Sequence, residues 1–256
     1  MDEKTIRDMF GWAPEPEAPN FRKIKAGSTE FLQILVPMGG LAGYACIPLS
    51  GRPDMSRPYG CESVLEHLGR RLDLHVREHG SDEGFRLDED ALDDIRDEIL
   101  DFYRRRRFLL ETAAPAGEFG VVVRDGEHAL ELMDMVDTYS GDSERAWSHR
   151  KYEPYIRCHI TEAQALLGLR QSDYPRLIAA VRDGIEAIDR FDRAHDTWEY
   201  ADIDESIYPR RLIHHLRDIA VRLLEKGQED AVEHEEYERA GAIRDLITQF
   251  EKEYAE

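Results

Sequence analysis

Residues 231–247 read AVEHEEYERAGAIRDLI, and this stretch decides how the end of the chain folds. Small and apolar side chains recur at helical spacing on both sides of Glu235-Glu236-Tyr237, which marks a turn. The pattern predicts a hairpin of two helices that the alanines allow to approach closely. Two short helices bury little surface alone, so a partner or the rest of the chain must cover them. The apolar positions are Leu223, Leu224 and Ala231 on the first helix, and Tyr237, Ala240, Ile243, Leu246 and Ile247 on the second.

The same stretch closely resembles the UVR motif, whose usual run is A-V-E-x-E-D/E-Y/F-E-x-A-A-x-L/I-R-D-x-I. That motif is the helical hairpin shared by the B and C subunits of the bacterial UvrABC excision nuclease. Similar segments occur in the zinc-finger activator of the protein-arginine kinase and in some Clp ATPases. The resemblance covers residues 223–254, and it departs from the usual run at Gly241, where alanine is usual. Glycine there is expected to weaken the second helix by up to ~1 kcal/mol.

In proteins with this motif the partner is often another UVR hairpin, so the resemblance implies a site for a second protein. A homodimer through two copies of the hairpin is one option. The alternative is that the hairpin packs on this chain's own helices. The residues expected to form the protein-binding site are Ala231, Val232, Glu233, Glu236, Tyr237, Glu238, Ala240, Ile243, Arg244, Asp245 and Ile247.

The composition is that of an acidic protein with a real core. The 256 residues include 54 acidic and 34 basic side chains, a net charge of −20, and 41% are hydrophobic. The acidity opposes direct contact with nucleic acid, because phosphate binding depends on Lys and Arg. Three widely spaced cysteines, Cys46, Cys61 and Cys158, predict neither a disulfide framework nor a zinc site. A reducing cytoplasm fits this usage best.

The segment Phe31–Gly51 has no charged side chain and is long enough to span a bilayer. Its two prolines and several glycines would expose unpaired backbone to lipid, so we expect no membrane segment. The segment instead predicts two strands, Phe31–Val36 and Leu41–Ile47, joined by residues 37–40. With Phe21–Lys25 they form a small antiparallel sheet. The N-terminus is charged and leads into no apolar run, so we expect no secretory signal.

From Glu62 onward the apolar period becomes helical. The first helix carries Val64, Leu68 and Val76 on one face and ends at Gly80. A second begins at Asp88 or Asp90 and reaches Leu110. Later helices are expected over residues 119–139, 152–169, 174–192, 207–225 and 231–254, with residues 140–148 as a polar loop.

A faint repeat links two of these helices. Val123-Arg124-Asp125-Gly126 recurs as Val181-Arg182-Asp183-Gly184. The segment Ala163–Ile188 partly resembles a tetratricopeptide repeat, which implies stacked helical hairpins, although a plain bundle is an alternative. The fold class is therefore α+β and mostly α: a small N-terminal antiparallel sheet, then stacked helical hairpins ending in a UVR-like hairpin. The expected domains are a mobile lead-in over 1–20, the sheet and its loop over 21–60, a helical-hairpin domain over 61–205, and the C-terminal helices over 206–256.

Residues 51–60, GRPDMSRPYG, predict a stiff loop. With Glu62-Ser63, Leu65-Glu66 and Gly80–Phe85 this loop resembles a shared stretch of a little-characterised group of bacterial UVR-motif proteins. Met55 replaces its middle glycine, and no assigned activity comes with the resemblance. Two arginines on stiff backbone could clamp a carboxylate, with Asp54 fixing one of them. The alternative is a structural joint between sheet and helix. The candidate loop site is Arg52, Asp54, Arg57 and Glu62.

Two further patterns carry possible chemistry. His75-Val76-Arg77-Glu78-His79 matches H-x-x-E-H, in which the histidines would share zinc and Glu78 would act as base. The helix ends directly afterwards and no clear third ligand follows, and His214, His215 and His234 do not supply one. The run Arg104–Arg107 spreads around a helix, so we expect a solvated, ion-paired surface rather than one phosphate-binding patch.

Taken together, the sequence predicts a non-enzymatic cytoplasmic adaptor that binds another protein through the UVR hairpin, with no cofactor and no metal. No P-loop, GxSxG or CxxC motif is present. Two alternatives stay open. One is an accessory factor in nucleotide-excision DNA repair or protein quality control. The other is a metal-dependent hydrolase using His75, Glu78 and His79.

Overall fold

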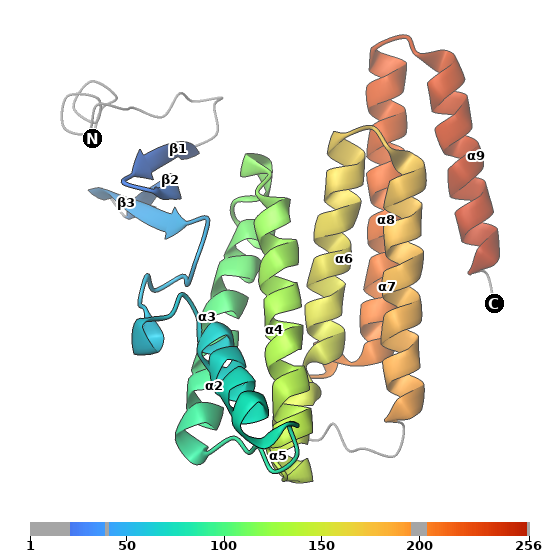
Figure 1. Ribbon diagram of the computed structural model, residues 1–256. Helices are drawn as coiled ribbons and strands as arrows, with labels where there is room; N and C mark the ends of the chain where they lie inside the picture. Colours follow the sequence, from blue (N-terminus) through green and yellow to red (C-terminus); the bar gives the residue numbers. More distant parts are fainter. Residues whose placement is uncertain (1–20, 39–40, 196–203, 255–256) are drawn as a thin grey trace. The chain divides into compact units, whose positions relative to one another are not determined.

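The computed structural model describes residues 21–38, 41–195 and 204–254 (Figure 1). The predicted lead-in over residues 1–20 and the turn residues Gly39-Gly40 lie outside this part. The chain forms two compact units, Met1–Val121 and Val122–Glu256, and each is described by itself.

The first unit begins with an antiparallel sheet in the order β1-β2-β3. Its strands are β1 (Phe21–Ala26), β2 (Thr29–Met38) and β3 (Leu41–Pro48). Leu32 of β2 pairs with Lys23 of β1 and with Ile47 of β3. The predicted sheet is confirmed, and each strand is slightly longer than expected. Gly27, with φ 62°, adopts the left-handed conformation that the first turn needs.

Two longer helices complete this unit, α2 (Val64–His79) and α3 (Glu89–Glu111). Ser63 caps α2 by accepting a hydrogen bond from the Glu66 amide at 3.0 Å, and Gly80 ends it with φ 83°. Of the two caps considered for α3, the structure uses Asp88, which accepts from the Ala91 amide at 2.9 Å. Short 3-10 turns lie at η1 (Pro58–Gly60) and η2 (Ala114–Ala116).

The second unit is helical. Its elements are α4 (Phe119–Tyr139), α5 (Ser143–Arg150), α6 (Glu153–Arg170), α7 (Tyr174–Ala194), η3 (Glu205–Ile207), α8 (Pro209–Glu233) and α9 (Tyr237–Glu253). The prediction of a loop over residues 140–148 was wrong, because Asp142 caps the polar helix α5 by accepting from the Glu144 and Arg145 amides. The predicted helix end at Glu225 was also wrong, since α8 continues through Gly227 to Glu233.

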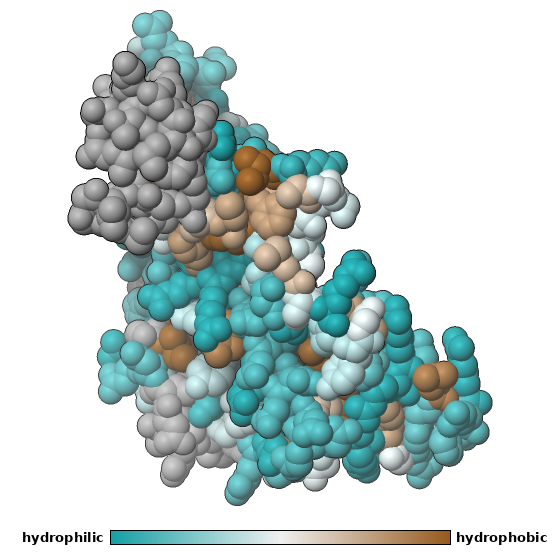
Figure 2. Space-filling view, turned by 90° about the vertical axis from the view of Figure 1, so that its left-hand side faces the viewer, coloured by the Kyte–Doolittle hydropathy of each residue, from teal (hydrophilic) through white to brown (hydrophobic). Residues whose placement is uncertain are grey.

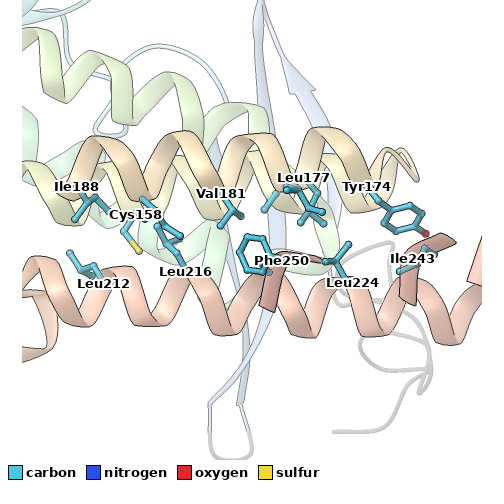
Figure 3. Packing of buried hydrophobic residues seen from close by; sticks show 14 of the residues in the cluster. Cys158, Tyr174, Leu177, Val181, Ile188, Leu212, Leu216, Leu224, Ile243 and Phe250 are labelled. Carbon is cyan, nitrogen blue, oxygen red and sulfur yellow. The ribbon is translucent and has the colours of Figure 1, made fainter. Parts of the chain in front are cut away.

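One hydrophobic core joins α6, α7, α8 and α9 (Figure 3). Leu177, Val181 and Ile188 of α7 face Leu216 and Leu224 of α8, and all five are buried. The core thus runs along both α7 and α8. It includes residues from the second half of α8 and from α9, namely Ala231, Ala240, Ile243 and Phe250.

The glycines of the repeated Val-Arg-Asp-Gly segments meet the same helix. A Cβ on Gly126 of α4 would lie 2.4 Å from a side-chain carbon of Ile160, and one on Gly184 of α7 would lie 2.0 Å from Thr161 Oγ1. Ile160 and Thr161 are neighbours on α6. Each repeat therefore supplies the glycine that lets its helix pack closely against α6.

The surface is mostly hydrophilic on the face shown in Figure 2, with separate hydrophobic patches. Within the described ranges, no helix is both long and apolar enough to cross a bilayer.

Candidate functional site

The inner face of the C-terminal hairpin is covered by the chain's own helices. Ala231 and Ile243 are 0% and 1% exposed, and both belong to the core that α7 and α8 share. Phe250 of α9 is buried in the same cluster and lies beside α8 in Figure 3. Of the two arrangements that the sequence left open for this apolar face, the structure shows packing on the chain's own helices. These side chains are therefore not available to a partner.

Tyr174, at the start of α7, fastens the hairpin to the rest of the unit. Its hydroxyl accepts a hydrogen bond from Arg239 Nη2 of α9 at 2.8 Å, and the guanidinium lies 5.5 Å from the ring centre. Arg239 also pairs with Glu236 at the turn. The Tyr174 ring lies against Gly227 of α8. One side chain thus contacts both arms of the hairpin.

A second group of contacts holds the far end of α9. Arg182 of α7 pairs with Glu253 through its Nε at 3.0 Å. The guanidinium of Arg217 on α8 lies 4.4 Å from the centre of the Tyr254 ring. Because α9 is fixed at both ends, the hairpin is an integral part of the helical unit.

The outer end of the hairpin is exposed. We define the hairpin tip as residues 229–238, the part of α8, turn and α9 that extends beyond the ends of α6 and α7 (Figure 1). Val232 and Tyr237 are 48% and 67% exposed there. The turn is closed by a hydrogen bond from the Glu236 amide to the Ala231 carbonyl at 2.8 Å. The exposed carboxylates of the tip are Glu229, Asp230, Glu233, Glu235, Glu236 and Glu238.

The residues expected to bind a partner therefore fall into three groups. Ala231, Ala240 and Ile243 are buried and Ile247 is partly buried, whereas Val232, Glu233, Glu236, Tyr237 and Glu238 are exposed on the tip. Arg244 and Asp245 are exposed further along α9 and pair with each other at 3.4 Å. An exposed valine and tyrosine among carboxylates can contact an apolar area bordered by basic groups on another protein.

The candidate loop site also divides into two pairs. Arg52 is buried and makes two hydrogen bonds to Asp54, Nε to Oδ1 at 2.9 Å and Nη2 to Oδ2 at 3.0 Å. Arg57 and Glu62 are exposed on the surface and approach each other only to 3.5 Å. The two arginines do not converge, so the structure brings together no clamp of the kind that the sequence suggested.

Two further carboxylates of α3 surround the Arg52 guanidinium. It pairs with buried Glu98 through Nη1 and with Asp101 at 3.4 Å. Burial works against the charge of Arg52, but the Asp54 hydrogen bonds and the nearby charge of Glu98 outweigh it and raise its pKa. The hydrogen bond from Arg52 in turn holds the pKa of Asp54 below its ordinary value, although burial opposes this. Arg52 therefore joins the loop to α3.

Glu98 is the residue that sequence reasoning missed. Its side chain is 0% exposed and accepts hydrogen bonds from the Val64 amide at 2.8 Å and the Leu65 amide at 3.3 Å. It thus caps α2 from a neighbouring helix while it neutralises Arg52. Glu98 falls on the stripe of Ala91, Ile95 and Phe102, and a carboxylate on an apolar stripe is the signal that could have revealed it.

The H-x-x-E-H segment ends α2. His75 Nε2 lies 3.0 Å from the Glu83 carbonyl, and His79 Nδ1 lies 3.0 Å from the His75 carbonyl. The two rings stack with their centres 4.3 Å apart. In the described parts of the chain, no group of three or more His, Cys, Asp or Glu side chains is arranged to hold a metal ion.

The other three histidines that the sequence analysis considered belong to the second unit. His215 lies 3.8 Å from Glu162, and His234 contacts the Asp230 carbonyl at 2.7 Å, while His214 is exposed.

The run Arg104–Arg107 is only partly the solvated surface that the sequence predicted. Arg104 and Arg107 are exposed and pair with Asp101 and Glu111. Arg105 and Arg106 are buried, and Arg105 donates to the Pro48 carbonyl at 2.9 Å. The prediction was wrong for these two because their side of α3 belongs to the interior, where the end of β3 accepts the hydrogen bond.

Comparison with known proteins agrees with the geometry of the hairpin. Residues 219–253 match the family described as UvrB/uvrC motif. No curated protein and no solved structure matches the chain. The matched residues coincide with the second half of α8, the turn and α9. The C-terminal hairpin of this protein is therefore a UvrB/uvrC motif, built into its helical unit.

Proposed function

We propose that the protein is a non-catalytic adaptor of the cytoplasm that binds another protein through the hairpin tip. The observation that carries this proposal is the division of the motif into a covered and an uncovered part. The inner face is covered within the core that the hairpin shares with α6 and α7, whereas Val232 and Tyr237 are exposed at the tip. Large apolar side chains that stay in water at the end of an interaction motif are suited to contact with a partner.

The charge of the tip restricts the partner. Six exposed carboxylates lie on the same short segment as the two apolar side chains. They repel phosphate, which disfavours direct binding to nucleic acid. They favour a protein surface with basic groups around an apolar patch. Another protein with a UVR motif, or a second copy of this chain, is a candidate if its contact surface has this character.

A second candidate function is an accessory role in nucleotide-excision DNA repair or in protein quality control. The match to the UvrB/uvrC motif supports it, because subunits of the excision nuclease carry that motif. In this role the tip would bind a protein of the repair or quality-control machinery. The same surface serves both proposals, and the identity of the partner distinguishes them.

The experiment compares partners of the full chain and of a variant with Val232→Ser and Tyr237→Ser. Both side chains are already exposed, so the variant keeps its fold. Leu74→Ser is the matched control, since Leu74 of α2 is 55% exposed and lies outside the motif. We expect proteins captured from a bacterial extract by the wild type and by the control to be lost with the tip variant. Identical partner sets for all three would contradict the proposal.

A further inference from the structure

Tyr59 of η1 has an unusual backbone conformation. Its φ is 54° and its ψ is 24°, a left-handed conformation that is uncommon for residues other than glycine. Its ring is 62% exposed. The sequence places Gly60, which adopts this region freely, directly after it. A tyrosine in a strained and exposed position is the kind of feature that marks a functional site.

The contacts of Tyr59 fix its ring at the opening between α2 and α3. The hydroxyl donates a hydrogen bond to Asp94 Oδ2 at 2.5 Å. The ring stacks on His67, with centres 4.0 Å apart and an angle of 17° between the planes. Arg52 anchors the start of this loop through Glu98, so the loop has a firm base from which to hold the ring. The result is an aromatic wall of two rings.

This wall borders a hollow of about 380 Å³. Val64, Leu68 and Ala91, all buried, line it with apolar surface. The hollow therefore combines an apolar floor with a flat aromatic side, an arrangement suited to a small organic group.

The other side of the hollow is acidic. Asp88 pairs with Arg71 at 3.0 Å, and Asp94 is engaged by Tyr59. Asp90 lies one turn before Asp94 on α3, and it has no hydrogen bond or ion pair with any residue that the structure describes. Burial and the charge of Arg71 lower the pKa of His67, so the stacked imidazole is neutral near pH 7. The lining of the hollow therefore carries three carboxylates, those of Asp88, Asp90 and Asp94, and one cationic side chain, that of Arg71.

We propose that the hollow between α2 and α3 binds an organic cation, a guanidinium or alkylammonium group on a short apolar stem. The stem lies on Val64, Leu68 and Ala91, and the cationic head lies against the Tyr59 ring. Asp90 and Asp94 accept its hydrogen bonds. This site lies in the first unit and is independent of the hairpin tip.

The test is a calorimetric titration of the full chain with butylguanidine and with butylurea, which has the same stem and a flat but neutral head. We expect butylurea to bind about tenfold more weakly, the effect of losing a charge-assisted hydrogen bond. Equal binding of the two compounds would overturn the proposal.

One matched pair of variants and one further variant locate the site. Asp90→Asn should weaken butylguanidine binding about tenfold. Asp93→Asn removes the same charge from an exposed residue paired with Arg96, and should change binding less than about twofold. Equal losses of butylguanidine affinity in the two variants would mean diffuse attraction to an acidic surface and would overturn the site.

Tyr59→Gly tests the aromatic side of the hollow. Glycine suits the left-handed backbone, so this variant should stay folded by circular dichroism and still bind butylguanidine about tenfold more weakly. Full binding by this variant would also overturn the proposal.

A further titration identifies the source of the cation. N-acetylarginine amide carries the guanidinium of a peptide side chain. If N-acetylarginine amide binds more tightly than butylguanidine, the natural ligand is an arginine side chain of a polypeptide. If it binds more weakly, the natural ligand is a free amine or guanidine compound. Binding of neither compound would overturn the proposal.

Discussion

The ring of Tyr174 lies so close to Gly227 that a Cβ on residue 227 would come within 2.4 Å of its Cε1 atom. This approach explains why a glycine interrupts the apolar pattern of α8 without ending the helix. Gly227 is buried in the interior of α8, where the Tyr174 ring occupies the space that a side chain would take.

Gly227→Ala is expected to destabilise the protein. Alanine favours helix by about 1 kcal/mol, but overpacking a buried site costs about 1–3 kcal/mol. We expect the free energy of unfolding to fall by about 1 kcal/mol, measured by urea denaturation. A stability equal to or above that of the wild type would contradict the close packing of Tyr174.

Gly241→Ala is the matched change with the opposite sign. Nothing lies within 4 Å of a Cβ at Gly241, and the residue is in the middle of α9. Alanine should therefore raise the free energy of unfolding by up to ~1 kcal/mol. Urea denaturation measures this change in the free energy of unfolding. A loss of stability would contradict the open space around residue 241.

Glu98→Gln should strongly destabilise the first unit. The amide keeps the volume but removes the one fully buried carboxylate that pairs with the Arg52 guanidinium, whose remaining partners Asp54 and Asp101 are more exposed, and we expect a cost of about 3 kcal/mol. Hydrogen exchange at the Val64 and Leu65 amides should become faster, because Glu98 accepts from both. Glu62→Gln is the control, since that side chain is 75% exposed and its loss should cost less than about 0.5 kcal/mol.

Asp54 should make the stability of the protein depend on acid pH. Its folded-state pKa is held below the ordinary 3.8 by Arg52, so the unfolded chain binds more protons in this range. The contribution is complete above the ordinary pKa and is lost as pH falls below about 4 toward the folded-state value. Asp54→Asn should therefore lose less stability than the wild type between about pH 5 and about pH 2. Parallel pH profiles would contradict the pairing with Arg52.

Partner binding through the tip should depend on salt. The exposed carboxylates act through charges that ions screen, so raising the salt from about 0.05 M to about 0.5 M should weaken binding about tenfold. The double change Glu233→Gln and Glu236→Gln should reduce this dependence, whereas Glu186→Gln and Glu225→Gln, two exposed acids outside the tip, should not. Affinity measured at several salt concentrations decides between these outcomes.

The sequence predicted the elements whose patterns are local. The strands around Leu32, the cap of α3 at Asp88, the end of α2 at Gly80 and the turn before Tyr237 all depend on neighbouring residues. The UVR resemblance is confirmed by the family match. The polar helix α5 escaped prediction because its cap, Asp142, supports a helix with almost no apolar face.

What the sequence could not supply are contacts between distant residues. Glu98 receives hydrogen bonds from amides more than thirty positions earlier, and Tyr174 meets Arg239 across 65 positions. The apolar seam of the hairpin gives the same signal whether it packs within the chain or on a partner. Only the arrangement of α7 and α8 shows that this seam is closed and that the exposed apolar groups lie at the tip.

Helix α8 packs along α6 and α7 and ends in the hairpin tip without a break. Its 25 residues form a rod about 37 Å long. The motif therefore cannot be deleted without damage to the helical unit, because Leu224 and Phe250 belong to its hydrophobic core. A truncation of the motif would destabilise this unit as well as remove the tip. Because α8 is continuous, a force that a partner exerts at Val232 would be transmitted along the helix to the level at which Leu216 packs against α7.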